Sequence, residues 1–499
     1  MRAPSWAVAL VVALFSTAFF SITVAAAHGK PFWHDEIFTI LFARLPSVDG
    51  MWRASRDGFD QMPPLNALAT HLLRSFTGDG PIVTRLPPMV GVWIMCLAVF
   101  AIVRRRSNVI LALGAAMLLA WTAALRYAVE ARGYGLMLAC FGLAAFAWSE
   151  AAHGRRRAVY LPLLALSLGA GAWAHYYGIL NVAPLAAGEL VRTIRRRRPD
   201  WRMWAAFASA LVLMLPLALL VGVPLALSET SWTRLEPTGV RDAYSFLFSS
   251  LLDPRLILAA LLVTALGRLE RVVVTRPPEG DRIPPHEVVA AIACLLLPLA
   301  GVAARSLGFG VFVPRYGLSA VVGFCTVIPL VVWVGSGRSR VAALVVCAWL
   351  FTGFAQSAWA ARGAPWDTHP DPFARRPLLA QALARGEQVC VTGGLMYLQL
   401  WYYAPPLVRS RLCYLADPAA ARRLANTDSF DVGLLALRRW TAVTVRDYGP
   451  FVEAHPAFTV YAAGSGWLLQ RLVESGANVR ETGTELGAPI SLVALPGAR

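Results

Sequence analysis

Long apolar stretches recur along the chain from its start to about residue 360. A helix needs about 20 apolar residues to cross the hydrocarbon core of a bilayer, and most of these stretches approach that length. They predict about eleven membrane-spanning helices, at residues 6–27, 86–103, 108–125, 134–151, 158–174, 177–194, 203–226, 255–267, 286–304, 317–335 and 341–360. The first stretch could also be a signal peptide, but its apolar run is longer than such peptides usually have, which favours an uncleaved first span.

A shorter amphipathic pattern covers residues 63–77. Its apolar face includes Leu72 and Phe76, and its other face carries Asn66, Thr70 and Arg74. The pattern is too short to span a membrane. We therefore expect a helix that lies along the outer membrane surface.

Residues 362–499 differ from the rest of the chain because their apolar runs shorten to strand length. Three strands and one helix are predicted, at residues 388–392, 458–462 and 490–495 for the strands and 466–474 for the helix. We therefore expect a small extracytoplasmic α/β domain at 362–499, after a polytopic all-α membrane domain at 1–361.

The chain contains seven cysteines, and five of them lie in predicted spans, where cysteine is usually a small core residue. Cys390 and Cys413 lie in the predicted outer domain, where disulfides can form. A disulfide between them and two separate thiols both remain open.

Composition supports the membrane class, because 57% of the 499 residues are hydrophobic and only 15% are charged, against about 25% in soluble proteins. The net charge is +17, and Lys30 is the only lysine. Such a charge suggests nucleic-acid binding, but the arginines sit in short blocks between the apolar stretches, as in 104–106, 155–157 and 195–198. Basic short loops stay cytoplasmic, so this distribution indicates a membrane topology and no nucleic-acid partner.

The topology that follows places a set of loops on the outer side of the cell or plasma membrane. These loops cover residues 28–85, 126–133, the region around 175, 227–254 and 305–316, and the chain also ends outside. We find no P-loop, GxGxxG motif or CxxC pair, which argues against an ATP-driven transporter, a dinucleotide-binding enzyme and a structural zinc site.

The first outer loop carries two adjacent carboxylates, Asp35 and Glu36, within Trp33-His34-Asp35-Glu36. Asp35 could cap a short helix that runs to Arg44, with Glu36 in its first turn, since acidic residues stabilise helix N-termini. They could also be catalytic, with Asp35 accepting a proton from an acceptor hydroxyl during sugar transfer.

Further motifs follow on the outer side in the order Pro63-Pro64-Leu65, Arg85-Leu86-Pro87, residues 127–134, His175-Tyr176-Tyr177-Gly178 and Pro314-Arg315-Tyr316. With the Asp35-Glu36 motif, this series resembles the membrane glycosyltransferases of the GT-C fold. Protein O-mannosyltransferases, the lipid A aminoarabinose transferase and the lipopolysaccharide-core galacturonosyltransferases are such enzymes, in a group similar to glycosyltransferase family 39. The resemblance covers roughly residues 1–335.

The resemblance implies an inverting transfer from a polyprenyl-phosphate sugar to a hydroxyl of a cell-envelope glycan, lipid or protein. It also implies catalytic roles for Asp35 and Glu36, with Asp35 as the base. The remaining residues that match its motifs would bind the substrates: Glu130, Arg132, Arg126, His175, Tyr176, Arg315 and Tyr316. Among them, the arginines would bind the donor phosphate, because guanidinium groups pair with phosphate oxygens.

Each of these residues also has a structural interpretation. Glu130 could form a loop ion pair with Arg126 or Arg132 instead of orienting the acceptor or helping to hold a metal. The arginines and the aromatic residues are also common at membrane interfaces. Some relatives use a divalent cation, but the chain has no Asp-x-Asp motif, and Gly133 stands where the family usually has proline.

Three other functions compete with this interpretation. A glycan polymerase or ligase of the same fold would be expected to have a large central outer loop. A transporter or lipid flippase would need ionisable residues along its spans, and the middles of these spans carry almost none. A catalytically inactive relative would keep the fold without the chemistry.

Overall fold

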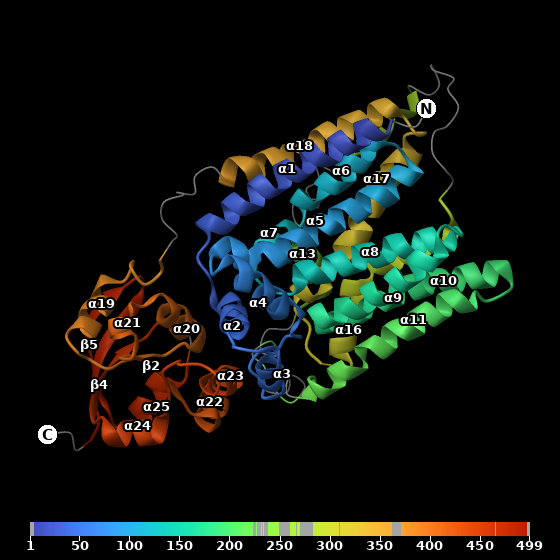
Figure 1. Cartoon of the computed structure of the whole chain (residues 1–499). Coiled ribbons are helices and arrows are strands. Elements are labelled where there is room, and N and C mark those ends of the chain that lie inside the picture. The colour runs from blue at the N-terminus through green and yellow to red at the C-terminus, as the bar shows by residue number, and fades with distance from the viewer. Residues whose placement is uncertain are drawn as a thin grey trace. The chain divides into compact units, whose positions relative to one another are not determined.

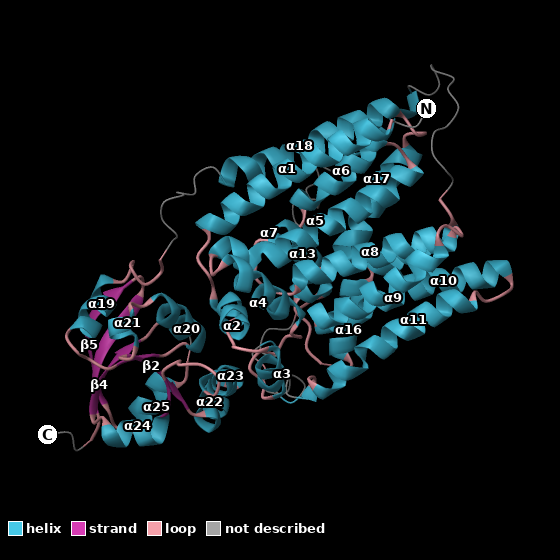
Figure 2. Cartoon of the chain, viewed as in Figure 1, coloured by secondary structure: helices cyan, strands magenta, loops and turns pink. Residues whose placement is uncertain are grey.

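The structure is a computed structural model that describes residues 4–222, 238–248, 260–265, 267–269, 283–308, 310–361, 371–464 and 466–496, with isolated residues 226, 231 and 233. The chain divides into two compact units. The first contains Met1–His28, Met62–Ala218 and Thr238–Ala364, and the second contains Gly29–Gln61, Leu219–Pro237 and Pro365–Arg499. The described elements of the first unit are helices, whereas strands occur in the second (Figure 2).

The first unit is a bundle of helices (Figure 1). Its α-helices are α1 (Ser5–Gly29), α4 (Leu65–Thr77), α5 (Pro81–Arg106), α6 (Val109–Met117), α7 (Ala124–Ala128), α8 (Tyr134–Ala152), α9 (Arg157–Ala174), α10 (Val182–Arg196), α11 (Trp201–Met214), α13 (Val240–Phe248), α15 (Pro285–Leu295), α16 (Leu297–Ser306), α17 (Ala320–Gly335) and α18 (Arg340–Ala361). Short 3₁₀ segments connect several of them, namely η1 (Leu118–Trp121), η2 (Tyr176–Asn181), η3 (Leu215–Leu219) and η6 (Pro314–Gly317).

Six helices in the described part of the chain are long and apolar enough to cross a membrane, and a seventh span results if α15 and α16 are counted together. The six are α1, α5, α8, α9, α11 continued by η3, and α18. The protein is therefore a multi-pass membrane protein. The predicted spans 108–125 and 317–335 contain helices that are shorter than a full span, and 255–267 lies partly outside the described residues. The predicted number of spans stays a prediction.

Two predicted spans are not continuous α-helices. In the predicted span 286–304, α15 and α16 meet at an angle of 49°. Pro298 lies in the first turn of α16 and cannot donate the backbone hydrogen bond that a continuous helix needs. The predicted span 177–194 begins as η2 and becomes α-helical only at Val182.

Helices α5 and α8 approach each other closely because small residues face the contact. A Cβ atom added to Gly91 would lie 2.4 Å from the carbonyl oxygen of Gly135, and one added to Gly135 would lie 2.4 Å from that of Pro88. Any side chain at either glycine would therefore clash with backbone. Close backbone approach at small residues is typical of helix pairs in membranes.

A buried network of charges joins several helices where the arginine blocks lie. Arg106, which is 3% exposed, donates two hydrogen bonds to Glu287 at 2.9 and 2.6 Å. Ser149 also donates to Glu287, at 2.8 Å, and the Nη2 atom of Arg106 lies 2.9 Å from the ring of His153. The network thus links the end of α5 to the end of α8 and the start of α15.

A second group of charges extends this network to α9, α10 and α11. Asp200 accepts hydrogen bonds from Arg157 at 2.8 and 2.6 Å and from Arg192 at 3.1 Å. Arg192 also donates to Glu189 at 2.7 Å, and Glu189 accepts a further bond from the indole of Trp148. Because α5, α8 and α10 end here while α9, α11 and α15 begin here, one end of the bundle carries the arginine blocks and their acidic partners.

The predicted amphipathic helix is α4, and it turns its polar face toward the protein. Asn66 and Thr70 are 4% and 2% exposed, whereas Leu72 and Phe76 are 59% and 81% exposed. A helix in water would do the opposite. This orientation suits a helix that presents its apolar side to lipid.

The second unit contains two short helices from the first predicted outer loop, α2 (His34–Ala43) and α3 (Val48–Arg56). It also contains a C-terminal domain, by which we mean the described residues 371–496. The helices of this domain are α19 (Pro377–Ala384), α20 (Gly394–Tyr403), α21 (Pro406–Arg409), α22 (Pro418–Ala425), α23 (Ser429–Arg438), α24 (Tyr448–Ala454) and α25 (Leu468–Glu474). Its strands are β1 (Val389–Val391), β2 (Leu412–Ala416), β3 (Val445–Asp447), β4 (Ala457–Tyr461), β5 (Asn478–Glu485) and β6 (Ala488–Ala494).

The six strands form one sheet in the order β3-β2-β1-β4-β6-β5. Strands β1 to β4 pair in parallel, and β6 pairs antiparallel with both β4 and β5. Strands β5 and β6 are joined at Leu486 and Gly487, which both have positive φ angles, as a tight hairpin turn requires. The three predicted strands correspond to β1, β4 and β6, and the predicted helix corresponds to α25.

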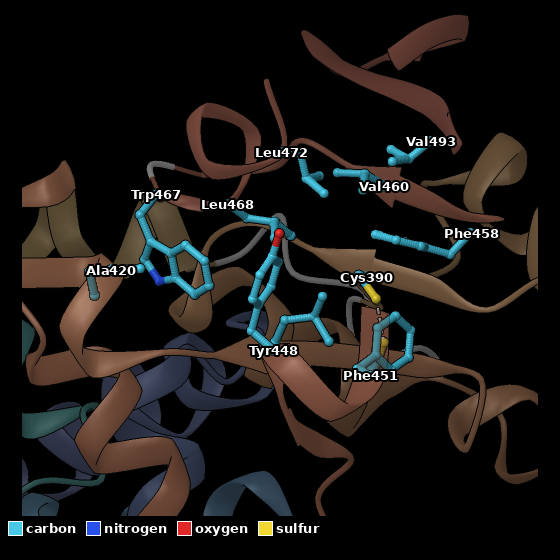
Figure 3. Packing of buried hydrophobic residues seen from close by; sticks show 13 residues of the cluster. Cys390, Ala420, Tyr448, Phe451, Phe458, Val460, Trp467, Leu468, Leu472 and Val493 are labelled. Carbon is cyan, nitrogen blue, oxygen red and sulfur yellow. Dashed lines mark hydrogen bonds between the residues drawn. The ribbon is translucent and has the colours of Figure 1, made fainter. Parts of the chain in front are cut away.

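A hydrophobic core packs against this sheet, and Trp467, Tyr448, Phe451 and Phe458 contribute their rings to it (Figure 3). Cys390 and Cys413 lie in the same core, directly opposite each other on β1 and β2. Their sulfur atoms are 2.6 Å apart. The two side chains thus face each other across neighbouring strands, in a position where oxidation could join them.

Asp431 is one of the buried carboxylates of the C-terminal domain. Asp431 is 2% exposed and accepts hydrogen bonds from the Tyr414 hydroxyl at 3.0 Å, the Asp417 backbone N–H at 2.9 Å and the Trp467 indole at 3.1 Å. Burial raises the pKa of Asp431 to about 6, although these donors oppose the rise. The residue ties α23 to β2 and to the start of α25.

We predict that the charge network at the arginine end stabilises the bundle. Replacing Glu287 with Gln leaves the buried Arg106 without its counter-charge, and losing one partner of a buried ion pair costs about 3–5 kcal/mol. The midpoint of thermal unfolding of the protein in detergent should therefore fall clearly. The matched control is Asp49→Asn, which breaks an exposed pair with Arg53 and should change the midpoint little. Equal midpoints for the two variants would contradict a stabilising network.

Candidate functional site

The Asp35-Glu36 motif opens helix α2 in the second unit. The N-cap residue is Trp33, and Asp35 and Glu36 follow in the first turn. The structural alternative in which Asp35 caps the helix is therefore wrong, although Glu36 does lie in the first turn. Glu36 acts at this helix end instead, because its side chain reaches back to accept a hydrogen bond from the Trp33 backbone N–H at 3.3 Å.

The two carboxylates have different surroundings. Glu36 is fully buried and lies 3.9 Å from the ammonium group of Lys30. The Asp35 side chain is 26% exposed and lies 3.6 Å from the ring of His34. Glu36 therefore contributes to the structure of the turn, and Asp35 is the more exposed of the two; their catalytic roles stay predictions.

The remaining predicted site residues lie in the first unit, at helix ends. Residues 129–133 join α7 to α8 and include Glu130 and Arg132, which are 4% and 7% exposed. A Cβ atom at Gly133 would lie 1.9 Å from the carbonyl oxygen of Ala174 at the end of α9. Proline, which also has a Cβ atom, could not occupy this position in the observed backbone. The departure from the family pattern at Gly133 thus has a steric reason.

Aromatic rings bring three of the predicted motifs together. The ring of His175, which follows α9, lies 4.8 Å from that of Tyr134 at the start of α8 and 5.1 Å from that of Tyr316 in η6. Tyr316 stacks on Tyr177 with their centroids 4.5 Å apart, and the Tyr177 hydroxyl donates to the carbonyl oxygen of Val311. Tyr176 begins η2 beside this cluster in sequence and is partly buried.

The arginines of these motifs differ in their positions. Arg315 donates a hydrogen bond to the Tyr134 hydroxyl at 2.9 Å, and its guanidinium lies 5.7 Å from the centre of the Tyr316 ring. Arg126 is exposed and lies over the rings of Tyr127 and Phe246, 5.4 Å from each centroid. This cation–π contact agrees with the interpretation of Arg126 as an interfacial anchor. Arg315 instead joins the aromatic cluster.

The electrostatics of His175 reflect these neighbours. Burial and then the positive charges of Arg132 and Arg315 lower the pKa of His175 to about 3. The imidazole is therefore neutral at physiological pH and is not the source of a positive charge here. Its Nδ1 atom accepts a hydrogen bond from the Tyr177 backbone N–H at 3.2 Å, while Nε2 is buried without a hydrogen-bond partner among the described residues.

Two buried asparagines were not included in the sequence-based site. Asn66 on α4 and Asn181 at the end of η2 are 4% and 1% exposed, and their amide atoms make no hydrogen bond within the described residues. Buried amides are normally hydrogen-bonded, so such groups are candidates for contact with a ligand. Sequence offers little signal for them, because asparagine is common at helix ends.

A metal ion would need a group of suitable ligands. The described residues contain no cluster of three or more histidine, cysteine, aspartate or glutamate side chains that could hold one. No chemical step is assigned to a metal, and the divalent cation that the family resemblance suggests stays a prediction.

No protein-family model matches the chain, and no curated protein matches it. Solved structures do match. ArnT from Cupriavidus metallidurans in the apo state superposes with a TM-score of 0.61 at 13% sequence identity, over 97% of both chains. ArnT from the same organism bound to undecaprenyl phosphate gives a TM-score of 0.55 at 12% identity, over 99% of both chains.

A third structure, the Archaeoglobus fulgidus oligosaccharyltransferase in complex with Zn and sulfate, has a TM-score of 0.44 at 11% identity, over 96% of this chain and 72% of that chain. The two ArnT structures cover both the helical part and the C-terminal part of the chain. ArnT is an aminoarabinose transferase with the GT-C fold. The chain therefore has the GT-C fold of the membrane glycosyltransferases, as its motifs predicted.

Proposed function

We propose that the protein is an integral membrane glycosyltransferase that moves a sugar from a polyprenyl-phosphate donor to a hydroxyl acceptor on the outer face of the membrane. The full-length match to ArnT carries this proposal, since one of the matching structures binds undecaprenyl phosphate. The acceptor would be a cell-envelope glycan, lipid or protein. No observation favours a transporter or flippase in its place.

The distribution of charge in the first unit supports the outward orientation. Arg106, Arg157 and Arg192 lie at one end of the bundle, together with their acidic partners. Helices α8 and α10 run from the predicted site motifs to that end, and α9 runs back from it. The motifs at residues 127–134 and 175–178 therefore lie at the opposite end, which supports an outer position for them under the positive-inside rule.

The proposed reaction needs a base, and Asp35 is the candidate. Its carboxylate would accept the proton of the acceptor hydroxyl as that oxygen forms a bond to the anomeric carbon of the sugar. The bond between the anomeric carbon and the phosphate oxygen breaks in the same step, with inversion at that carbon. The partial exposure of the Asp35 side chain supports this role, and the burial of Glu36 favours a part for Glu36 in supporting α2.

The leaving group is polyprenyl phosphate, which gains negative charge as the bond breaks. Arg315 and Arg132 are the candidates to stabilise it, because charge-assisted hydrogen bonds to phosphate strengthen as that charge develops. Tyr134 orients the Arg315 guanidinium through their 2.9 Å hydrogen bond. His175, held neutral beside both arginines, can donate or accept a hydrogen bond without adding charge.

The donor class is the first testable consequence. Purified protein should release undecaprenyl phosphate from an undecaprenyl-phosphate sugar, offered as a panel of pentoses and hexoses with total envelope lipid as acceptor. The matching nucleotide sugars should give no transfer. Such donors are confined to the cytoplasm, so a site on the outer face would have no use for binding them. Transfer from a nucleotide sugar alone would refute the proposal. Mass spectrometry of envelope lipids, glycans and glycoproteins from a strain that lacks the protein should identify the acceptor as the molecule missing one sugar.

Asp35→Asn tests the base directly. The change keeps the size of the side chain and most of its hydrogen bonding but removes proton acceptance, so the rate of transfer should fall roughly 10²- to 10⁴-fold. Unfolding temperature and donor affinity should change little. Glu36→Gln serves as the comparison, and we expect it to affect stability more than the chemical step. An Asp35→Asn protein that folds normally and retains most of its activity would exclude Asp35 as the base.

Arg315→Lys tests the phosphate contact. Lysine keeps the charge but lacks the planar group that pairs with two oxygens, so kcat/KM for the donor should fall roughly 10- to 100-fold, as expected for one lost charge-assisted hydrogen bond. Tyr134→Phe, which removes only the hydroxyl that orients Arg315, should cost less. The control is Arg202→Lys at the exposed start of α11, where no loss is expected. A loss at Arg202 equal to that at Arg315 would contradict the assignment.

A further inference from the structure

The peptide groups just before the Asp35-Glu36 motif are held by helix α20 of the C-terminal domain. The backbone N–H of Phe32 donates a hydrogen bond to the hydroxyl of Tyr403 at 2.7 Å. The backbone carbonyl of Phe32 accepts one from the side-chain amide of Gln399 at 2.8 Å. Gln399 and Tyr403 are four residues apart and so lie on one face of α20.

Side-chain contacts strengthen this attachment. Phe32 is 4% exposed, and its ring meets that of Tyr402 edge-on with centroids 5.9 Å apart. The guanidinium of Arg44, the C-cap residue of α2, lies over the same Tyr402 ring, 5.6 Å from its centre. Tyr402 therefore contacts residues on both sides of α2.

The same outer-loop segment has a second attachment beyond α3. The indole N–H of Trp440 donates a hydrogen bond to the carboxylate of Asp57, the C-cap residue of α3, at 3.1 Å. The C-terminal domain thus holds the segment at residues 32 and 57. Asp35 lies between these two points, three residues after Phe32.

The two faces of α20 have different roles. Tyr397, Leu398, Leu400 and Trp401 are buried, the first three completely, whereas Gln399 is only half-buried. The donor atoms of Gln399 and Tyr403 are bonded to the Phe32 backbone. These two polar side chains therefore connect their domain to the outer-loop segment.

From this arrangement we propose that α20 is a positioning element for Asp35, and that Gln399 and Tyr403 are its positioning residues. Fixing both peptide groups of Phe32 fixes the backbone that enters the N-cap at Trp33, from which α2 and its Asp35 carboxylate project. A base must be placed within about 0.5 Å of its working geometry to be effective. The inference rests on the proposed function, because it assumes that Asp35 is the base.

The test is a pair of substitutions that remove only the two hydrogen bonds, Tyr403→Phe and Gln399→Met. The double variant should lower kcat roughly 10- to 100-fold, because a misplaced catalytic group slows the chemical step. KM for the undecaprenyl-phosphate sugar should change less than about twofold, since donor binding does not involve these residues. The control is Tyr397→Phe, which removes a hydroxyl from the buried face of the same helix and should leave kcat unchanged.

A coupling experiment separates positioning from a general structural effect. In the Asp35→Asn background, Gln399→Met with Tyr403→Phe should cost little further activity, because the group that they position no longer accepts a proton. A full additional loss in that background, or a wild-type kcat in the double variant, would overturn the inference.

Hydrogen exchange provides a readout that does not depend on activity. The amide of Phe32 should exchange faster in Tyr403→Phe than in the wild-type protein, and Tyr397→Phe should not change it. Unchanged exchange at Phe32 would refute the attachment itself. A second outcome separates the two proposals. If Tyr403→Phe speeds exchange at Phe32 but the wild-type protein shows no transferase activity with any donor, the attachment is confirmed, whereas the proposed function and the positioning role are both refuted.

Discussion

The fold depends on one constraint, which is that a backbone in lipid must satisfy its own hydrogen bonds. The chain meets it with helices, and groups that are not hydrogen-bonded within a helix are left at helix ends. The predicted site residues lie at such ends. Arg132 precedes α8, His175 follows α9, and Arg315 lies in the 3₁₀ segment before α17. The polar side chains of the candidate site therefore lie at helix ends.

The arginines at the two ends of the helical unit have different hydrogen-bond partners. At the arginine end, Arg106 and Arg192 are paired with carboxylates at close distance, so that their charges are neutralised within the protein. At the other end, Arg315 is bonded to a tyrosine hydroxyl and packs against aromatic rings. The Tyr134 hydroxyl thus helps to orient the Arg315 guanidinium, whereas the hydrogen-bond partners of Arg106 and Arg192 include carboxylates.

Much of the fold could be predicted because apolar length and arginine position are strong signals. The helices α1, α5, α8, α9 and α18 appear close to the predicted ranges. Helices with internal breaks could not be predicted well, because Pro298 bends the pair α15 and α16 while Pro87 and Pro88 leave α5 continuous. Whether a proline breaks a helix depends on its neighbours in space. Strands β2, β3 and β5 were not predicted for a different reason: short buried strands and polar edge strands carry little periodic signal.

The candidate site was predictable as a set of residues but not as a set of contacts. Sequence order grouped Tyr134, His175 and Arg315 as outer-loop motifs, and the structure brings all three side chains together. The resemblance named Asp35 as the base, but the sequence could not show that Glu36 is buried while Asp35 is partly exposed, because that difference depends on where α2 begins. The sequence placed Asn66 on the polar face of a helix but did not show that Asn66 and Asn181 are buried with no hydrogen bond of their amide atoms among the described residues.

The attachment of Phe32 illustrates why such contacts escape sequence analysis and why they matter. Phe32 and Tyr403 are 371 residues apart, and the bond uses a backbone N–H that every residue except proline possesses. No pattern in the sequence marks that pairing. Ordering a surface loop costs conformational entropy. The three hydrogen bonds at Phe32 and Asp57 offset part of that cost, which is consistent with a functional need for a defined loop geometry. In the positioning role that we propose, the C-terminal domain acts on the chemistry through the backbone of the loop.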